Sequence, residues 1–177
     1  MASSVTKGLA VGAVLFGGIL AGVTANRALV QLPAWERVGV VAWANFTRAE
    51  NLGTGFVFYP VIGLAALLLT AAVAIAFRFD RAARGSRGLP IYSAVVLAIV
   101  WAVVTRGVLV PAMLSLRTAG DNAAELQRIF LTVARWSEVN DLLHVLTFGL
   151  NLWALTEFWS GRKVIETNRA PRFGPGR

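Results

Sequence analysis

The chain has 177 residues, of which 56% are hydrophobic and only 15% are charged, whereas soluble domains carry about 25% charged residues. The absence of cysteine excludes disulfide bonds, iron–sulfur clusters and cysteine-based redox chemistry, and the single histidine excludes a haem held by two histidines of this chain. The net charge of +8 is interpreted as a signal of membrane topology, and we expect no nucleic-acid partner.

Four apolar stretches are long enough to cross ~30 Å of hydrocarbon, which takes about 20 helical residues. They cover about Val5–Ala25, Gly53–Phe77, Ile91–Leu114 and Val139–Trp159. The first stretch, with Lys7 near its start, also resembles a cleaved signal peptide, but its apolar run is long for one and we expect a retained helix. The sequence therefore predicts an all-α, polytopic membrane protein whose residues 1–160 form a bundle of four transmembrane helices.

The basic residues between these stretches predict the orientation of the chain. Ten of them lie on the side that contains Lys7, the segment 78–87 and the C-terminal tail, and six lie on the other side. Because cytoplasmic loops are rich in Lys and Arg, we expect a multi-pass cell-membrane protein with both termini in the cytoplasm. Residues 161–177 are expected to form a basic, flexible cytoplasmic tail, which is either a solvated topology signal or a contact for anionic lipid headgroups.

The two connections on the opposite side have helical patterns of their own. In the first, Trp35 and Trp43 indicate a short interfacial helix with both indoles in the headgroup layer. In the second, an apolar stripe over residues 123–134 indicates another short amphipathic helix, capped by Asp121 or Asn122. We expect both short helices to lie over one end of the bundle.

Glycines follow the first stretch in two GxxxG pairs, Gly8 with Gly12 and Gly18 with Gly22. Small residues let helices approach closely in lipid, where no hydrophobic force drives association. Internal packing is the first interpretation. The alternative is self-association, or contact with another membrane protein, through Gly18 and Gly22.

Polar residues recur on one side of the last stretch. Asn140, His144, Thr147 and Asn151 share an arc of roughly 60° on a helix. Because polar side chains in hydrocarbon are costly, this stripe should face the interior of the bundle. It either forms interhelical hydrogen bonds or lines a binding pocket, with Trp136 flanking it and Asp141 beside it.

Arg106 is a second ionisable residue inside a predicted span. With the third stretch running outward and the fourth inward, Arg106 and His144 both belong to the outer half of the bundle. Asp141 or a bound anionic ligand could neutralise Arg106. The alternative to a functional role is a structural ion pair.

Three segments form a recognisable pattern: the glycine-rich run from Gly17 to Gly22, the following Leu32-Pro33, and the segment from Arg106 to Leu155. In the last of these a span ends at Pro111, an amphipathic stretch follows, and Arg135-Trp136 precedes Asn140 at the start of the last span. Together these segments resemble the anthrone-oxygenase-like family, which consists of small four-span membrane proteins mostly of unknown function. The resemblance implies oxidation of polyketide anthrones without an evident redox cofactor, with Trp136 and Asn140 as the matching positions.

Two functions from different classes follow. In the first, the protein is an enzyme that oxidises a hydrophobic aromatic substrate: His144 is the general base and Arg106 or Asn140 stabilises the enolate. The substrate would lie against Trp136, Asp141, Thr147 and Asn151. In the second, the protein is a non-catalytic accessory subunit that packs through its glycine-rich helix and holds a lipid, quinone or pigment. The sequence assigns no cofactor and no metal site.

Overall fold

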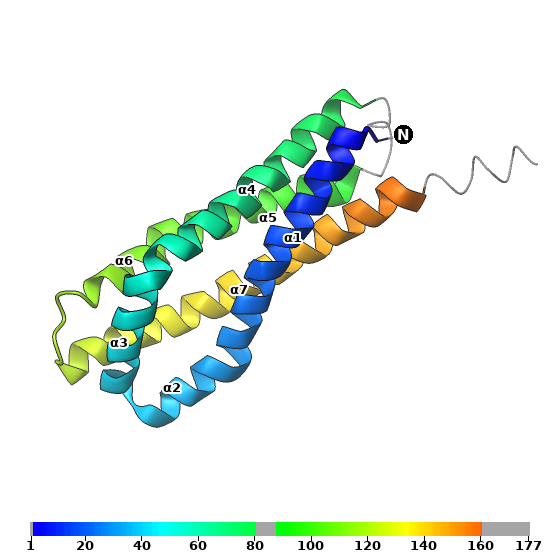
Figure 1. Ribbon diagram of the computed structural model, residues 1–177. Helices are drawn as coiled ribbons and strands as arrows, with labels where there is room; N and C mark the ends of the chain where they lie inside the picture. The colour runs from blue at the N-terminus through cyan, green and yellow to red at the C-terminus, as the bar shows by residue number, and fades with distance from the viewer. Residues whose placement is uncertain (1, 81–87, 161–177) are drawn as a thin grey trace, which may run out of the picture.

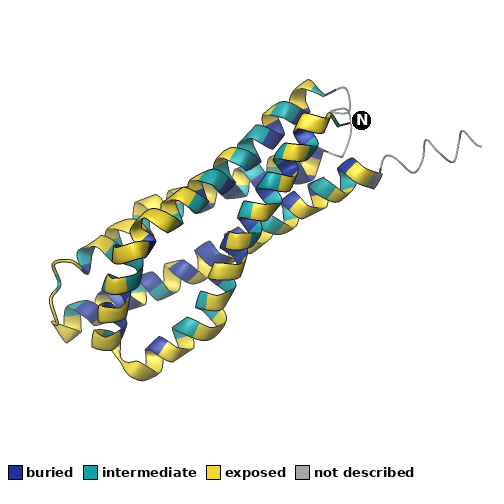
Figure 2. Cartoon of the chain, in the orientation of Figure 1, coloured by how far each residue is buried: buried dark blue, intermediate teal, exposed yellow. Residues whose placement is uncertain are grey.

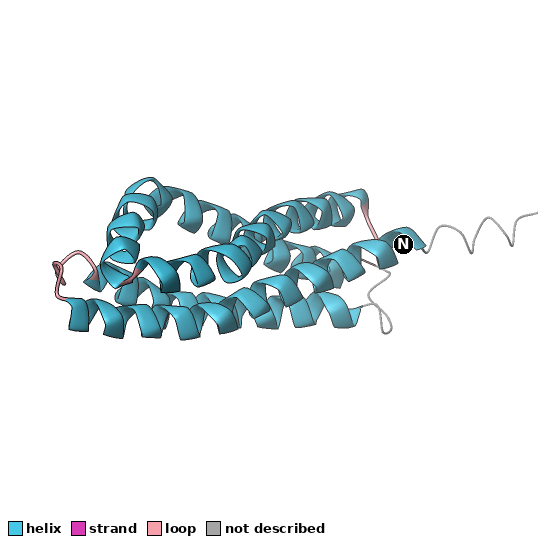
Figure 3. Ribbon diagram, turned by 90° about the horizontal axis from the view of Figure 1, so that it is seen from below, coloured by secondary structure: helices cyan, strands magenta, loops and turns pink. Residues whose placement is uncertain are grey.

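The structure is a computed structural model that describes residues 2–80 and 88–160, and within these ranges every regular element is helical (Figure 3). The α-helices are α1 (Ser4–Asn26), α2 (Leu32–Val38), α3 (Val40–Ala49), α4 (Gly55–Phe79), α5 (Leu89–Val104), α6 (Val110–Ser115) and α7 (Ala123–Ser160). Three π-helical segments connect them: η1 (Arg27–Gln31) joins α1 to α2, η2 (Glu50–Thr54) joins α3 to α4, and η4 (Thr105–Leu109) joins α5 to α6. The prediction of an all-α protein is confirmed.

Three helical stretches are long and apolar enough to cross a membrane, the second of them kinked at Gly53. They are Ser4–Val38, Val40–Phe79 and Leu89–Ser115, and they contain the first three predicted spans. The helix α7, which contains the predicted fourth span, does not qualify, because the polar residues in its middle lower its hydropathy. The helices therefore indicate association with a lipid bilayer, with three spans identified by length and composition where the sequence predicts four.

One end of the molecule is a compact bundle of α1, α4, α5 and α7, and the first residues of α1 and the last of α7 both lie at this end (Figure 1). Its hydrophobic core, which we call the terminal cluster, consists of Ala10, Ala13, Val73, Ala74, Phe77, Ile91, Ala154 and Phe158. The buried residues face one another inside the bundle, while the outward faces of α4 and α5 are largely exposed (Figure 2). This exposed surface is apolar, with Leu64, Leu68 and Val103 more than half exposed, as expected for helices surrounded by lipid.

A second hydrophobic core lies at the other end, where α2, α3 and the start of α7 meet. This distal cluster consists of Trp35, Trp43, Ala44, Leu116, Leu126, Ile129, Phe130 and Val133. The sequence places Trp35 and Trp43 in the headgroup layer, which stays a prediction; within the protein they are buried, at 9% and 1% exposed. Trp43 packs edge-on against Phe130 with 5.1 Å between ring centroids, a geometry that aromatic pairs prefer.

The short helices of the two connections also differ from prediction. The first is divided into α2 and α3 at Gly39, whose φ of 85° is readily adopted only by glycine. The second is not separate, since residues 123–134 are the first turns of the 38-residue α7. At 1.5 Å per residue α7 is ~57 Å long, so it extends well beyond ~30 Å of hydrocarbon. Both connections do pack together at one end of the bundle, as predicted.

Side-chain hydrogen bonds hold the distal connections in place. The predicted cap is Asn122, whose Oδ1 accepts from the backbone N–H groups of Ala124 (3.1 Å) and Glu125 (3.3 Å) at the start of α7. Arg48 of α3 donates to the carbonyl oxygens of Leu116 (3.0 Å) and Gly120 in the α6–α7 connection. A single guanidinium therefore fixes this connection against α3.

Candidate functional site

The polar face of α7 lies between the two hydrophobic clusters. We use this name for six residues that are all at most 8% exposed: Ser137, Asn140, Asp141, His144, Thr147 and Asn151. On the same helix the distal cluster ends at Val133 and the terminal cluster begins at Ala154. The sequence-based prediction that the stripe of four polar residues faces the bundle interior is confirmed by their burial.

Three of the six side chains of this face, Asn140, Asp141 and Asn151, join α7 to other helical segments. The Thr105 hydroxyl in η4 donates to Asn140 Oδ1 (3.2 Å), and Asn151 Nδ2 donates to Thr70 Oγ1 of α4 (3.1 Å). The hydroxyl of Thr147 is used within α7, where it donates to the carbonyl oxygen of Leu143 (2.7 Å). Interhelical bonds of this kind stabilise membrane helix pairs by about 0.6 to 2 kcal/mol each.

An ion pair joins the first and last helices one turn away from His144. Arg27, the first residue of η1, donates from both Nε (3.3 Å) and Nη2 to the two carboxylate oxygens of Asp141. The sequence suggests Arg106 as a partner of Asp141, but the structure gives that place to Arg27. Arg106 is exposed on η4, and it forms no ion pair with any residue in the described ranges.

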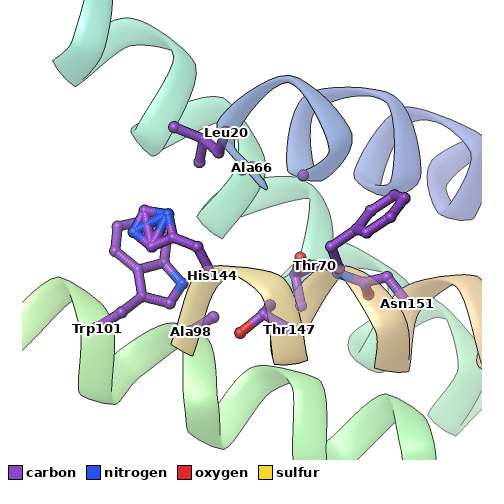
Figure 4. A pocket seen from close by; sticks show the side chains of 10 residues that line it. Leu20, Ala66, Thr70, Ala98, Trp101, His144, Thr147 and Asn151 are labelled. Carbon is purple, nitrogen blue, oxygen red and sulfur yellow. Dashed lines mark hydrogen bonds between the residues drawn. The ribbon is translucent and has the colours of Figure 1, made fainter. Parts of the chain in front are cut away.

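His144 lines a hollow between the four long helices (Figure 4). Its walls are formed by Gly17 and Leu20 of α1, Ala66 and Thr70 of α4, Ala98 and Trp101 of α5, and His144, Thr147, Phe148 and Asn151 of α7. The hollow measures about 260 Å³ including its open part. Only about 10 Å³ of it is wide enough for water, which is room for about one molecule.

The two ring nitrogens of His144 have different surroundings. Nε2 lies 3.2 Å from Asn140 Nδ2, while Nδ1 is buried and has no hydrogen-bond partner within residues 2–80 and 88–160. The ring lies against Trp101 with 4.5 Å between centroids and 49° between planes. His144 is therefore held on one edge and against one ring face, and it retains one free nitrogen.

The predicted site residues do not all come together. His144, Thr147 and Asn151 line the hollow, and Asn140 and Asp141 lie buried on its distal side. Trp136 is 37% exposed and does not line the hollow, and neither does Arg106.

Four residues in contact with the polar face were not found from the sequence: Arg27, Thr70, Trp101 and Thr105. In the sequence, Arg27 is only one of the basic residues in the first connection. The other three lie in apolar runs, where no regular spacing of polar residues points to them.

The glycines of α1 divide between inside and outside. A Cβ added at Gly12 would lie 3.4 Å from Leu69, and one at Gly18 would lie 3.2 Å from the Phe148 ring, so these two glycines allow close helix packing within the chain. A Cβ added at Gly8 or Gly22 would have no other helix or side chain of the described part of the chain within 4 Å. Each GxxxG pair therefore contributes one glycine to the bundle and leaves the other on the exposed surface.

Comparison of the chain with protein-family models, curated proteins and solved structures finds no match. The fold and the site themselves define a helical membrane protein with a band of buried polar residues between two hydrophobic cores. Across residues 2–80 and 88–160, no three His, Asp or Glu side chains gather as ligands for a metal ion.

Proposed function

We propose that α7 crosses the membrane as a fourth helix. It packs between α1 and α5 along the terminal cluster and the hollow, at the same depth as the three apolar helices. Its polar groups are buried, and its outward face presents Leu142, Val145, Leu146 and Leu152, each 42–59% exposed. A helix of low mean hydropathy can lie in lipid when its polar residues face the bundle interior.

The proposed topology keeps both termini in the cytoplasm of a cell-membrane protein. An even number of crossings agrees with the start of α1 and the end of α7 lying at the same end of the bundle (Figure 1). Most of the basic residues behind this orientation, in the segments 81–87 and 161–177, lie outside the described residues. Reporter fusions after Arg84 and after Asp121 should report opposite sides, the first inside; the reverse result, or the same side for both, would contradict the topology.

For this protein we propose the role of a non-catalytic subunit of a larger membrane complex. The observation that carries the proposal is the use of the polar face, because Asn140, Asp141 and Asn151 are all engaged by side chains of other helices. The remaining hollow has room for about one water and none for an aromatic substrate. With these three polar side chains used in holding the bundle, the chain acts through its surface.

A partner surface is proposed on α1, where Gly8 and Gly22 are exposed with open space around them. The test is mild purification of the full chain from its native membrane, followed by cross-linking and mass spectrometry. We expect a stoichiometric partner protein that is lost on Gly22→Leu and kept on Gly149→Leu, since Gly149 of α7 is equally open. A chain that purifies alone, or two variants that behave alike, would contradict the role.

Oxidation of a hydrophobic aromatic substrate is the second candidate, and one observation favours it: His144 has a free buried nitrogen beside an aromatic ring. Here His144 and Asn140 would contact the reacting oxygen, and the hollow would have to widen around the substrate. With an anthrone and air, we expect the anthraquinone absorbance to appear, and His144→Ala to lower its rate by a factor of about 10² or more. The matched control is Leu146→Ala on the lipid-facing side; equal rates for the two variants would exclude this candidate.

A further inference from the structure

We propose that His144 carries its proton on Nδ1 and donates it to an acceptor oxygen held in the hollow beside Trp101. The oxygen belongs to a water molecule or to the carbonyl group of a lipid-soluble molecule. This site is independent of the subunit role, because it concerns His144 Nδ1, which, like the Ser137 hydroxyl, has no hydrogen-bond partner among the described residues.

The position of the proton follows from the hydrogen bonds of Asn140. Its Oδ1 accepts from the hydroxyl of Thr105 (3.2 Å), which turns its Nδ2 toward His144 Nε2 (3.2 Å). An amide nitrogen only donates, so Nε2 must accept, and a neutral imidazole then has its proton on Nδ1. The reversed amide would place the proton on Nε2 and leave Nδ1 as an acceptor, and the experiment below separates the two arrangements.

A buried N–H without a partner is rare in folded proteins, and water is the usual partner where protein groups supply none. The Nδ1 atom is buried, and the ring to which it belongs lines a hollow that accommodates about one water. Thr70, Thr147 and Asn151 line the same hollow and bring further polar groups to it. A hollow of this size is therefore suited to a single oxygen atom beside Nδ1.

The chemistry of the site limits which oxygen atoms can bind there. An N–H donor at Nδ1 requires an acceptor, and the carbonyl oxygen of a ketone, quinone or ester can accept this hydrogen bond. A water molecule can accept it through a lone pair. The other walls are apolar, with Leu20, Trp101 and Phe148 around the oxygen, so a molecule larger than water must be soluble in lipid. If the enzyme candidate holds, His144 stabilises a substrate oxygen by hydrogen bonding in place of removing a proton.

Nitrogen-15 NMR tests the proton position directly, because this chain has one histidine and its two ring nitrogens give the only imidazole signals. The full-length protein, labelled with ¹⁵N-histidine, is placed in lipid bilayers near neutral pH. We expect a protonated Nδ1, an unprotonated Nε2 and a hydrogen-bonded Nδ1 proton. A protonated Nε2, or a Nδ1 proton without an acceptor, would overturn the proposal.

Two further arms identify the source of the oxygen. A magnetisation-transfer contact between the Nδ1 proton and water assigns a water. Addition of tetramethyl-1,4-benzoquinone as a probe should shift the Nδ1 signal if a carbonyl enters, whereas the corresponding hydroquinone diol serves as the matched comparison. An unchanged signal with both probes, together with the water contact, leaves the acceptor site standing with water as its occupant.

Variants separate the site from general packing. Asn140→Leu removes the donor that holds Nε2, so the imidazole is expected to shift toward the Nε2-protonated form. Leu146→Ala lies on the lipid-facing side of the same helix, and its ¹⁵N spectrum should match the original. Helical circular dichroism identifies any variant that fails to fold. A folded Asn140→Leu protein with an unchanged tautomer would contradict the role given to Asn140.

Discussion

Removal of either partner of the Arg27–Asp141 pair should have unequal effects on stability. In Arg27→Met, the Asp141 carboxylate, whose side chain is 8% exposed, loses both of its N–H donors. Loss of one partner from a buried ion pair destabilises by about 3–5 kcal/mol, and we expect about 3 kcal/mol here. In Asp141→Asn, the side chain left unpaired is Arg27, which is 27% exposed and can extend its charge toward water or headgroups. We therefore expect a loss of only about 1–2 kcal/mol.

Replacement of both partners should be milder than the worse single change. In Arg27→Met with Asp141→Leu, no charge is left buried, and apolar replacements of buried pairs are often neutral or better. The free energy of unfolding is measured in mixed micelles by titration with sodium dodecyl sulfate, followed by far-ultraviolet circular dichroism. The double variant is expected to be more stable than Arg27→Met alone.

The exposed pair of Arg128 with Glu125 is the matched control for this experiment. Its side chains are 69% and 38% exposed, and pairs of that kind contribute about 0–1 kcal/mol. Arg128→Met should therefore change the unfolding free energy little. The reasoning fails if Arg27→Met is as mild as Arg128→Met, or if the double variant is no better than Arg27→Met.

Three further predictions concern other contacts. Gly55→Ala should destabilise by about 1–3 kcal/mol in the same titration, because its Cβ would lie 2.6 Å from the Tyr59 ring; a neutral result would refute this. Arg48→Gln should lose about 2 kcal/mol, since two backbone carbonyls lose a charged donor, and hydrogen exchange in the α6–α7 connection should rise with it. Burial opposes ionisation of Asp80, but hydrogen bonds, including one from the Ser3 N–H (2.9 Å), hold its pKa below the usual 3.8. The stability contributed by the ionised Asp80 carboxylate is therefore present above about pH 4 and lost as pH falls through the lowered pKa. Protection of the Ser3 amide against hydrogen exchange should fall on acidification. Asp80→Asn should abolish that pH dependence.

The sequence predicted the interior face of α7 because a helix places residues three and four apart on one side. Asn140, His144, Thr147 and Asn151 share one side of the helix for this reason, and all four are buried. The continuity of α7 was missed although it was readable: no proline or glycine occurs between Ala123 and Phe148. The sequence pattern predicted a short helix over residues 123–134 separate from a span beginning at about Val139, yet the Arg135 and Glu138 between them are good helix formers.

Other features depend on contacts that a single sequence does not reveal. Arg27 and Asp141 are 114 positions apart, and no periodicity relates them. Trp35 and Trp43 have the residue type of a membrane interface, but the distal cluster provides partners that bury them. Tertiary packing decides how far an indole is buried, and the residues that pack against it include some on other helices.

Two of the three π-helical segments supply side chains to the polar face of α7. A π-turn inserts one extra residue into a helix and so changes the direction of the side chains beside it, and such turns are frequent at functional sites. Arg27 begins η1 and bonds to Asp141, and Thr105 begins η4 and bonds to Asn140. These two segments therefore occur where α7 is polar, between the hydrophobic clusters at its two ends. The third segment, η2, has its side-chain bond elsewhere, from Tyr59 to Glu50, so the link between an irregular turn and the polar face is particular to η1 and η4.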